Sequence, residues 1–588
     1  MSDVSGKAFD LKLLSRIIAY TKPYKKLFYG GILLTILLGA VGTTRPILIK
    51  YTIDHFVMKP DAVGLLNYTL LMVFLLLIET MLQFAFIYSA NYLGQSVIRD
   101  IRVLLFDKII KMRLAFFDKT PLGTLVTRAV SDIETIANIF AEGLLVIFGD
   151  LFKIVVMIAA MFYFFEWKLV LISLSVVPLL YFATRWFQRA IKVTFQDVRN
   201  QVARLNAFVQ EHLSGMLIVQ AFNREDMELN RFKDINKAHM DANIRSIWYF
   251  SIFLPIIEVL SAVSIGLAVW YGGVSAAMGG QVTFGDLTAI LIFINMLFRP
   301  LRQLADRFNT LQMGMVASER VLKLLDQEEK IQDNGVHHPS ELKGTIEFKD
   351  VWFSYIPDEW ILKGISLKIK QGETLAIVGA TGAGKSTIIN LVNRFYDIQK
   401  GEILLDGVNV KEYRLEGLRS NMALVLQDVF LFSNTVKQNV TLGSDISMDE
   451  LNEAARLIGV DDLLDKLPGS WEFKVGERGG TLSSGQRQLL AFLRAYISNP
   501  SILILDEATS SIDTHTELLI QKAIDKLTEG RTSIIIAHRL ATIQKADRIL
   551  VMDHGQIIEE GTHTELIQKE GAYHRLYEMQ FKKVEEET

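Results

Sequence analysis

Six long runs of apolar residues occupy the first half of this 588-residue chain and constrain its fold more than any other feature. They cover residues 27–44, 65–90, 139–165, 169–184, 247–274 and 284–301. Most of them approach or exceed the ~20 residues that a helix needs to cross the hydrocarbon core of a bilayer. The fourth run is shorter, but Arg185 and Trp186 can lie at the membrane interface while the helix continues. The first half of the chain therefore predicts an all-α membrane domain of six helices.

The distribution of basic residues predicts how this domain is oriented. Lysine and arginine are frequent before the first run, between the second and third runs, and between the fourth and fifth runs. The connection after the third run contains only Lys168, and the connection after the fifth run contains no basic residue. The first outer connection, with Arg45, Lys50 and Lys59, is a mild exception. Because basic loops stay on the cytoplasmic side, we expect both termini and the two long loops in the cytoplasm. No organelle-targeting extension is visible, so we expect a bacterial plasma (inner) membrane.

The two long cytoplasmic loops have a helix-like pattern, for example over residues 98–112 and 198–211. At a rise of ~1.5 Å per residue, such helices would extend tens of ångströms beyond the bilayer. Each has a turn-like tip, near residues 115–123 and 206–215. We interpret them as helical arms that contact a soluble domain, the alternative being mobile charged loops. Residues 10–24 are amphipathic and predict a helix along the inner membrane interface.

The second half contains a complete phosphate-binding loop of the form G-x-x-x-x-G-K-S. Residues 374–378 precede it as a predicted strand, and residues 387–395 follow it with the pattern of a helix. The glycines allow backbone N–H groups to surround phosphate oxygens, Lys385 supplies positive charge, and the Ser386 hydroxyl can bind Mg²⁺. We therefore expect this half to bind a nucleoside triphosphate. The loop consists of Gly379, Ala380, Thr381, Gly382, Ala383, Gly384, Lys385 and Ser386.

Short β-branched runs alternate with helical patterns from Gly344 onward, which is typical of an α/β fold with a partly parallel sheet. Two of these runs end in polar residues that suit a hydrolytic site. Gln427 follows the strand 423–426 and can reach Mg²⁺ or an attacking water. Asp506 and Glu507 follow the strand 502–505. Asp506 would hold Mg²⁺ through water, and Glu507 would polarise the nucleophilic water. Further strands are expected at residues 346–348, 403–405, 533–537 and 548–552.

Three more elements complete this arrangement. Tyr355 has a ring that can stack on a purine, and His538, after the strand 533–537, can bond the γ-phosphate. A lone tyrosine, glutamine or histidine is more often structural. The sequence L-S-S-G-Q at residues 482–486 is more restrictive, because it opens a helix some twenty residues before the Asp506-Glu507 strand. The helix N-terminus and the Ser483 hydroxyl can meet a phosphate there.

Composition limits the alternatives. The chain is 50% hydrophobic and 22% charged, which fits a membrane domain joined to a soluble one. The net charge is −3, so no overall basic field indicates nucleic acid as a partner. The absence of cysteine excludes disulfides, thiolate metal sites and cysteine nucleophiles.

In these motifs the chain resembles the exporters of the ATP-binding cassette superfamily over nearly its whole length. The resemblance implies a multidomain protein with an interfacial helix (1–26), a six-helix transmembrane domain (27–316), a linker (317–343), an α/β ATP-binding cassette (344–580) and a charged tail (581–588). By pattern, it is similar to bacterial half-transporters for drugs and lipids. Residues 120–126 and 206–213 would carry the two coupling helices, and Val475–Gly479 would contact the arms.

The resemblance also assigns roles to single residues. Glu507 is implied as the catalytic base, with His538, Gln427 and Lys385 in support. Ser386, Gln427 and Asp506 are implied as Mg²⁺ ligands. The implied ATP contacts are Tyr355, Gly379, Ala380, Thr381, Gly382, Ala383, Gly384, Lys385, Ser386, Thr387, Gln427, Ser483, Ser484, Gly485, Gln486, Asp506 and Asp513.

One position departs from the family pattern, because Ser484 stands where the family usually has glycine. It is either a tolerated variant in a homodimer or the altered half-site of a heterodimer with a related subunit. In both cases the resemblance implies that a second half-transporter completes the machine, with ATP held between two cassettes.

Charged residues inside the apolar runs are the only indication of the substrate. Asp150 and Lys153 are spaced to neutralise each other on one helix. Glu79 and Glu258 have no partner nearby in the sequence, so we interpret them as candidates for a substrate cavity that suits an amphipathic cation.

The predicted function is ATP-driven export or flipping of a hydrophobic or amphipathic drug or lipid by alternating access. The alternatives are an ATPase-gated channel or regulator of the same architecture, and an exporter of peptides or other specific solutes.

Overall fold

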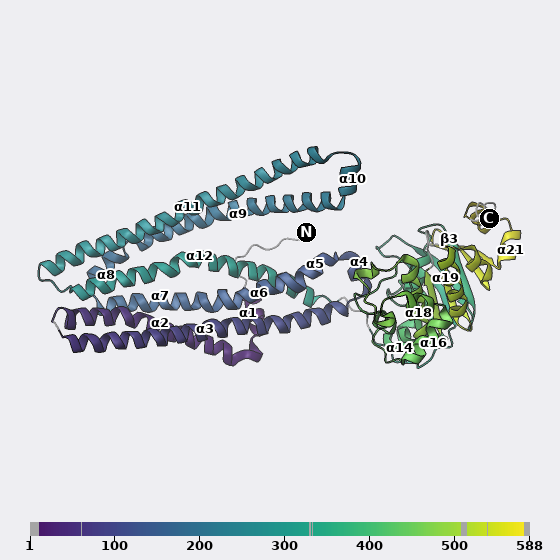
Figure 1. Ribbon diagram of the computed structural model, residues 1–588, viewed down its shortest axis with the longest axis horizontal. Helices are drawn as coiled ribbons and strands as arrows, with labels where there is room; N and C mark the ends of the chain where they lie inside the picture. The colour runs from purple at the N-terminus through teal and green to yellow at the C-terminus, as the bar shows by residue number, and fades with distance from the viewer. Residues whose placement is uncertain are drawn as a thin grey trace. The chain divides into compact units, whose positions relative to one another are not determined.

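The computed structural model describes residues 11–59, 61–328, 331, 333–506, 514–537 and 539–580. The chain divides into two compact units (Figure 1). The first comprises Met1–Lys111 and Pro121–Glu328, and the second comprises Met112–Thr120 and Glu329–Thr588. The segment Met112–Thr120, which we call the first arm tip, therefore belongs to the second unit.

The first unit is entirely helical in the residues described. Several of its helices run on into one another through short 3₁₀ or π turns. Its α-helices are α1 (Leu11–Ala19), α2 (Lys25–Thr52), α3 (Ala62–Ile110), α5 (Leu122–Thr127), α6 (Ile133–Asn138), α7 (Leu145–Phe164), α8 (Trp167–Leu174), α9 (Val177–Ser214), α10 (Met216–Ala221), α11 (Glu225–Ala277) and α12 (Phe284–Asp326). The turns are Lys22–Tyr24, Ile53–Val57, Arg128–Asp132 and Ile139–Leu144.

All six predicted apolar runs lie in these helices, so the predicted helical membrane domain is confirmed. Among the described residues, five helical stretches are long and apolar enough to cross a bilayer. The sixth run forms the first part of α12. The five stretches are Lys22–Val57, Ala62–Ile110, Leu122–Phe164, Trp167–Ser214 and Glu225–Ala277.

Small residues on α2 allow close packing of helices in this unit. Gly31 and Gly39 are buried on α2. A Cβ atom at Gly31 would lie 3.3 Å from Leu145 Cδ1, and one at Gly39 would lie 3.1 Å from the ring of Phe152, both on α7. Helices in lipid associate through such close contacts because lipid supplies no hydrophobic force between them.

The predicted arms are continuous helices, and the short tip helix lies beyond its predicted range only in the second arm. At ~1.5 Å per residue, α3 and α11, with 49 and 53 residues, are more than twice as long as a ~30 Å hydrocarbon core is thick. In the first arm, most of the short helix α5 (Leu122–Thr127) lies in the predicted range 120–126. The helix that groups with the second unit is α4 (Leu114–Lys119), most of which lies in the predicted tip 115–123. Thr120 is extended because it precedes Pro121.

In the second arm, the prediction for residues 206–213 is wrong, because they continue α9 without a helix breaker. The chain first turns at Gly215, and α10 (Met216–Ala221) is the short helix there (Figure 1). The predicted linker is also too long, since α12 reaches Asp326 and buries Val321 and Leu322.

The second unit contains two β-sheets. The four-stranded sheet has the order β2-β1-β4-β5, and the six-stranded sheet has the order β10-β9-β3-β8-β7-β6. The strands are β1 (Ile346–Phe353), β2 (Leu362–Ile369), β3 (Thr374–Gly379), β4 (Lys400–Leu405), β5 (Val408–Asn409), β6 (Met422–Val425), β7 (Ile502–Asp506), β8 (Thr532–Ile536), β9 (Arg548–Asp553) and β10 (Gln556–Gly561). The inner strands of the larger sheet are parallel, as expected. Sequence reasoning did not identify β2, β5 and β10.

Helices surround these sheets and complete the α/β unit. They are α13 (Lys385–Val392), α14 (Leu415–Ser420), α15 (Val436–Thr441), α16 (Met448–Ile458), α17 (Asp461–Lys466), α18 (Ser484–Ile497), α19 (Thr514–Thr528), α20 (Leu540–Lys545), α21 (His563–Gln568) and α22 (Ala572–Gln580). Short 3₁₀ turns occur at Val410–Glu412, Ser470–Glu472 and Glu477–Gly479.

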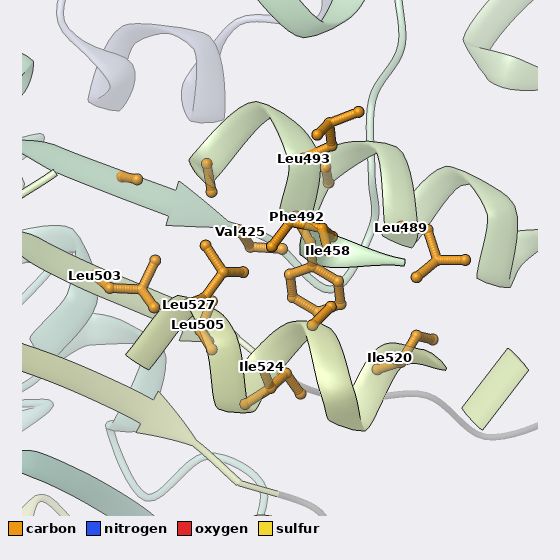
Figure 2. Close-up of a cluster of buried hydrophobic side chains, with 14 of the residues drawn as sticks. Val425, Ile458, Leu489, Phe492, Leu493, Leu503, Leu505, Ile520, Ile524 and Leu527 are labelled. Carbon is orange, nitrogen blue, oxygen red and sulfur yellow. The ribbon is translucent and has the colours of Figure 1, made fainter. Parts of the chain in front are cut away.

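A large apolar core fixes α18 against the six-stranded sheet. Figure 2 shows Phe492 of α18 among Ile520 and Ile524 of α19, with Val425 and Leu505 from the neighbouring strands. Phe492 is 1% exposed. This packing holds the first residues of α18, which belong to the L-S-S-G-Q segment, in a defined place on the unit.

Candidate functional site

The phosphate-binding loop joins the end of β3 to the start of α13. Gly384 is the N-cap of α13 and has a φ of 100°, a left-handed conformation that favours glycine. A Cβ atom at Gly379 would lie 2.2 Å from the carbonyl oxygen of Met552, so that position accepts no side chain. The loop therefore has no side chains at these two glycines that would shield its backbone from a ligand at the α13 N-terminus. The N–H groups of that N-terminus attract an anion.

The side chain of Lys385 folds back onto the carbonyl groups at the start of this loop. Its ammonium donates hydrogen bonds to the carbonyl oxygens of Gly379 (2.7 Å) and Ala380 (2.9 Å). Burial lowers the pKa of Lys385, and the nearby carboxylate of Asp506 acts in the opposite direction. A desolvated cation in this position is suited to bind a phosphate.

The predicted hydrolytic residues follow neighbouring parallel strands. β3 pairs with β8, β8 with β7, and β7 with β6, so the carboxyl ends of these strands share one edge. Asp506 is the last residue of β7 and lies opposite Ile536 of β8. Gln427 is exposed just beyond the end of β6. The structure thus brings Asp506 close to Lys385 and places Gln427 beyond the same edge. The predicted residues Glu507, Asp513 and His538 lie outside the described residues.

Tyr355 lies beside the phosphate-binding loop, as the predicted base-stacking role requires. Its hydroxyl donates to Thr387 Oγ1 (3.3 Å) and accepts from Asn390 Nδ2 (3.1 Å), both on α13. Tyr355 is 37% exposed, and its ring stands perpendicular to the rings of Phe353 and Tyr396. A flat ring is therefore presented to solvent and fixed to the helix that begins at Lys385.

The L-S-S-G-Q segment forms the N-terminus of α18. The Ser483 hydroxyl accepts from Gln486 N (3.2 Å), and Ser483 N donates to Gln486 Oε1 (2.9 Å), which is a capping box. Ser483 and Ser484 are exposed, whereas Gly485 is buried. These side chains are available to a ligand while the helix start is held firmly.

Helix α18, which begins in the L-S-S-G-Q segment, has different neighbours from α13, which follows the phosphate-binding loop. α18 packs on α15, α16, α19 and β6, whereas α13 packs on β3 and β8. The predicted ATP contacts of one chain thus form two groups, one around α13 and the other at α18.

Sequence reasoning missed Tyr396, which follows α13 and contacts Tyr355. Its ring centroid lies 5.0 Å from that of Tyr355, at an interplanar angle of 88°. Its hydroxyl donates to Asp118 of α4. The only indication in the sequence was that an aromatic residue follows the helix of the phosphate-binding loop. Its hydrogen-bond partner Asp118 is 278 residues away in the sequence and could not be inferred from spacing.

Charged residues in the first unit pair differently from the predictions. Glu79 of α3 has no partner nearby in the sequence, but Arg45 Nη1 of α2 lies 3.7 Å from Glu79 Oε2, and its cavity role stays a prediction. Asp150 pairs with Arg307 of α12 (3.0 Å), so its ion pair is not with Lys153. Both partners come from other helices, which spacing along one helix does not reveal. Glu258 is exposed on α11, and its cavity role stays a prediction.

Comparison with known families and proteins covers both units. Residues 28–301 match the ABC transporter transmembrane region, and residues 362–510 match the ABC transporter family. An uncharacterized ABC transporter ATP-binding protein of Bacillus subtilis is 35% identical, over 98% of this chain and 96% of its own length.

Two further relatives have more specific names. A probable multidrug resistance ABC transporter ATP-binding/permease protein of Bacillus subtilis is 37% identical, over 89% of this chain and 78% of its own length. An ATP-dependent lipid A-core flippase of Desulfotalea psychrophila is 33% identical, over 97% of this chain and 99% of its own length.

Proposed function

This chain belongs to the ABC transporter family and carries both the transmembrane region and the cassette. We propose that ATP bound and hydrolysed by the residues described above drives export through the membrane helices. The chain is an ATP-hydrolysing, multi-pass membrane transporter that exports lipids or drugs, as the names of its relatives indicate. We place it in a bacterial inner membrane with both termini in the cytoplasm, in agreement with the basic residues of the arms.

The ATP site proposed here combines positioning with charge neutralisation. Tyr355 stacks on the base, the loop N–H groups and Lys385 hold the β- and γ-phosphates, and Glu507 polarises the attacking water. The Ser386 hydroxyl, the Gln427 amide oxygen and the Asp506 carboxylate are hard oxygen donors of the kind that Mg²⁺ prefers. Bound Mg²⁺ would neutralise charge on the phosphates as the bond to the γ-phosphate breaks. His538 bonds the γ-phosphate oxygens.

We expect hydrolysis to require two cassettes. The single observation that carries this proposal is the separation of α13 and α18, which pack on different elements of one unit. A second chain supplies its α18 N-terminus to the γ-phosphate held at the first chain's α13. The partner is a second copy or a related subunit. With a related subunit, Ser484 of this chain serves the less active of the two ATP sites.

The tip of the second arm also fits an assembly of two chains. α10 exposes the apolar side chains of Leu217 and Ile218, which are 77% and 60% exposed. Phe222, directly after it, is 69% exposed. The orientation proposed above puts this tip in the cytoplasm, where exposed apolar groups need a protein partner. Such a contact would transmit cassette closure to α9 and α11.

The chain has no cysteine, so engineered thiol pairs test the shared ATP site directly. One chain carries Thr381→Cys and a second carries Ser484→Cys, both in a Glu507→Gln background that preserves ATP binding. We expect a disulfide between the two chains when ATP and Mg²⁺ are added to the mixed, reconstituted assembly. Either variant alone provides the control. Absence of a cross-linked pair, despite ATP binding by both variants, would contradict the two-cassette site.

A further inference from the structure

A cavity of about 520 Å³ adjoins Tyr355 in the second unit. Its walls include Asp118 and Lys119 of the first arm tip, together with Phe353, Tyr355 and Tyr396 of the cassette. Its size falls within the range of sites for small organic ligands. The first arm tip therefore forms one wall of the space beside the residue on which the base stacks.

Tyr396 touches both sides of this cavity. Its hydroxyl donates a hydrogen bond to the carboxylate of Asp118 on α4. Its ring meets those of Tyr355 and Phe353, with centroids 5.0 and 5.8 Å away. Burial, together with the hydrogen bond to the Asp118 carboxylate, raises the pKa of Tyr396, so the hydroxyl stays a donor at physiological pH.

The first arm tip is held to the cassette and is continuous with the arm. Phe116 of α4 is buried, and all of Met112–Thr120 groups with the cassette. Only Lys111–Arg113 separate the end of α3 from the start of α4. A shift of Asp118 is thus passed to the 49-residue helix α3 over a short length of chain.

We propose that Tyr396 is a positioning residue that links the base of the bound nucleotide to the first cytoplasmic arm. The base restrains the Tyr355 ring, the Tyr355 ring restrains Tyr396, and the Tyr396 hydroxyl sets the position of Asp118. This inference rests on the proposed ATP site, because it requires the base to stack on Tyr355. The base then has a second role besides binding, because it restrains the first arm tip through Tyr355 and Tyr396. The phosphates alone do not provide this restraint.

A fluorophore next to the first arm tip reports this link. Lys111→Cys introduces the only thiol, at an exposed position outside the cavity lining. The reconstituted full-length protein is labelled there with an environment-sensitive dye, and ATP with Mg²⁺ is added. We expect a fluorescence change with ATP and none with inorganic tripolyphosphate, which occupies the phosphate loop without a base.

Tyr396→Phe keeps the ring and removes only the hydroxyl. We expect the fluorescence change to fall at least about fivefold, the lower range of typical coupling between sites. The affinity for a fluorescent ATP analogue should stay within about threefold of the parent protein, a small change in binding free energy. Asp118→Asn, which keeps a weaker acceptor, should give an intermediate signal. Tyr413→Phe is the matched control, because the Tyr413 hydroxyl donates to Leu405 O within the cassette (2.9 Å) and Tyr413 does not line the cavity.

The outcomes separate this inference from the proposed ATP site. An undiminished fluorescence change in Tyr396→Phe would overturn the inference, and so would an equal change with tripolyphosphate. Loss of ATP binding together with the signal would assign Tyr396 to the binding site alone and would also overturn it. Failure of the labelled parent protein itself to bind the ATP analogue would instead refute the proposed ATP site.

Discussion

Lys385 and Glu507 have separable tasks at the scale of single residues. Lys385 is a buried cation held over the phosphate loop by two carbonyl oxygens, which a phosphate would replace as partners. Glu507 directly follows Asp506 at the end of β7 and acts on the water in the proposed mechanism. Loss of the first should therefore affect binding, and loss of the second should affect the chemical step.

We predict that Lys385→Ala weakens ATP binding by about ten- to a hundredfold, the value of a hydrogen bond to a charged group. Glu507→Gln should leave binding nearly unchanged and reduce turnover by at least about a hundredfold, as expected for loss of a general base. Equilibrium binding of a fluorescent ATP analogue and phosphate release on the same preparations measure both effects. Hydrolysis by Glu507→Gln at the parent rate would refute the base assignment.

The residues of the phosphate loop were predictable because their function depends on a local pattern. The spacing of Gly379, Gly384 and Lys385 fixes a strand, a turn and a helix start, and the structure confirms this conformation. Tyr396 and the partner of Glu79 were not predictable, because Asp118 and Arg45 reach them from distant elements. Sequence spacing describes contacts along one element, whereas these contacts form only when separate elements pack.

At the scale of elements, the start of α18 combines a structural cap with a proposed ligand site. Ser483 caps α18, and Ser447 caps α16 through the same kind of capping box in the same unit. An alanine at either position should cost about 1 kcal/mol of stability. The two caps therefore form a matched pair that separates structure from function.

We predict that Ser483→Ala and Ser447→Ala lower the thermal stability of the protein by similar amounts, whereas only Ser483→Ala lowers ATP turnover. Thermal unfolding and phosphate release, measured on both variants, provide the comparison. Equal loss of turnover in the two variants would show that the cap at α18 acts only through stability.

The second arm tip carries a pH-sensitive contact. His212 of α9 pairs with Glu228 of α11 (2.9 Å), and Glu228 also pairs with Arg231. The carbonyl of Phe208 and the Glu228 carboxylate raise the pKa of His212 above its usual value near 6.5. Because the folded pKa is raised, this contact stabilises the tip fully below about pH 6.5. The stabilisation is lost as the pH rises through the raised pKa.

A spin label at Leu217→Cys tests this contact, since Leu217 is exposed and the chain has no other thiol. We expect the label to be more mobile at pH 8.5 than at pH 6, because the neutral imidazole binds Glu228 more weakly. His212→Gln should remove most of this difference. A pH dependence that persists unchanged in His212→Gln would exclude His212 as its source.

Elements were predicted better than their ends. The apolar runs and the β-branched runs identified the membrane helices and most strands, because length and periodicity are properties of single segments. In the first arm, the predicted ranges 115–123 and 120–126 overlap α4 and α5. In the second arm, α10 lies beyond the predicted range 206–213, because α9 continues until the turn at Gly215. The alternating strand β10, which lies at the edge of the six-stranded sheet, was missed because only half of its side chains are covered.

At the scale of the whole molecule, the first arm tip is the segment that links the cassette to the membrane helices in the proposed mechanism. The residues of the proposed ATP site lie at α13 and α18 of the cassette, and the unit that contains the cassette includes a segment of the first arm. In the proposed mechanism, ATP-driven closure between two cassettes therefore moves an element that continues directly into a long membrane helix. Two chains, identical or related, are needed for this cycle in the proposed mechanism.

Transport by the purified protein tests the central claim most directly. The chain is reconstituted into liposomes, with its partner subunit if it has one. ATP-dependent uptake of ethidium and ATP-dependent flipping of a fluorescent phosphatidylethanolamine are then measured in parallel with phosphate release. We predict movement of at least one probe that requires ATP and Mg²⁺ and disappears in Glu507→Gln. Sustained ATP hydrolysis without movement of these probes or of any other amphipathic compound tested would contradict the account.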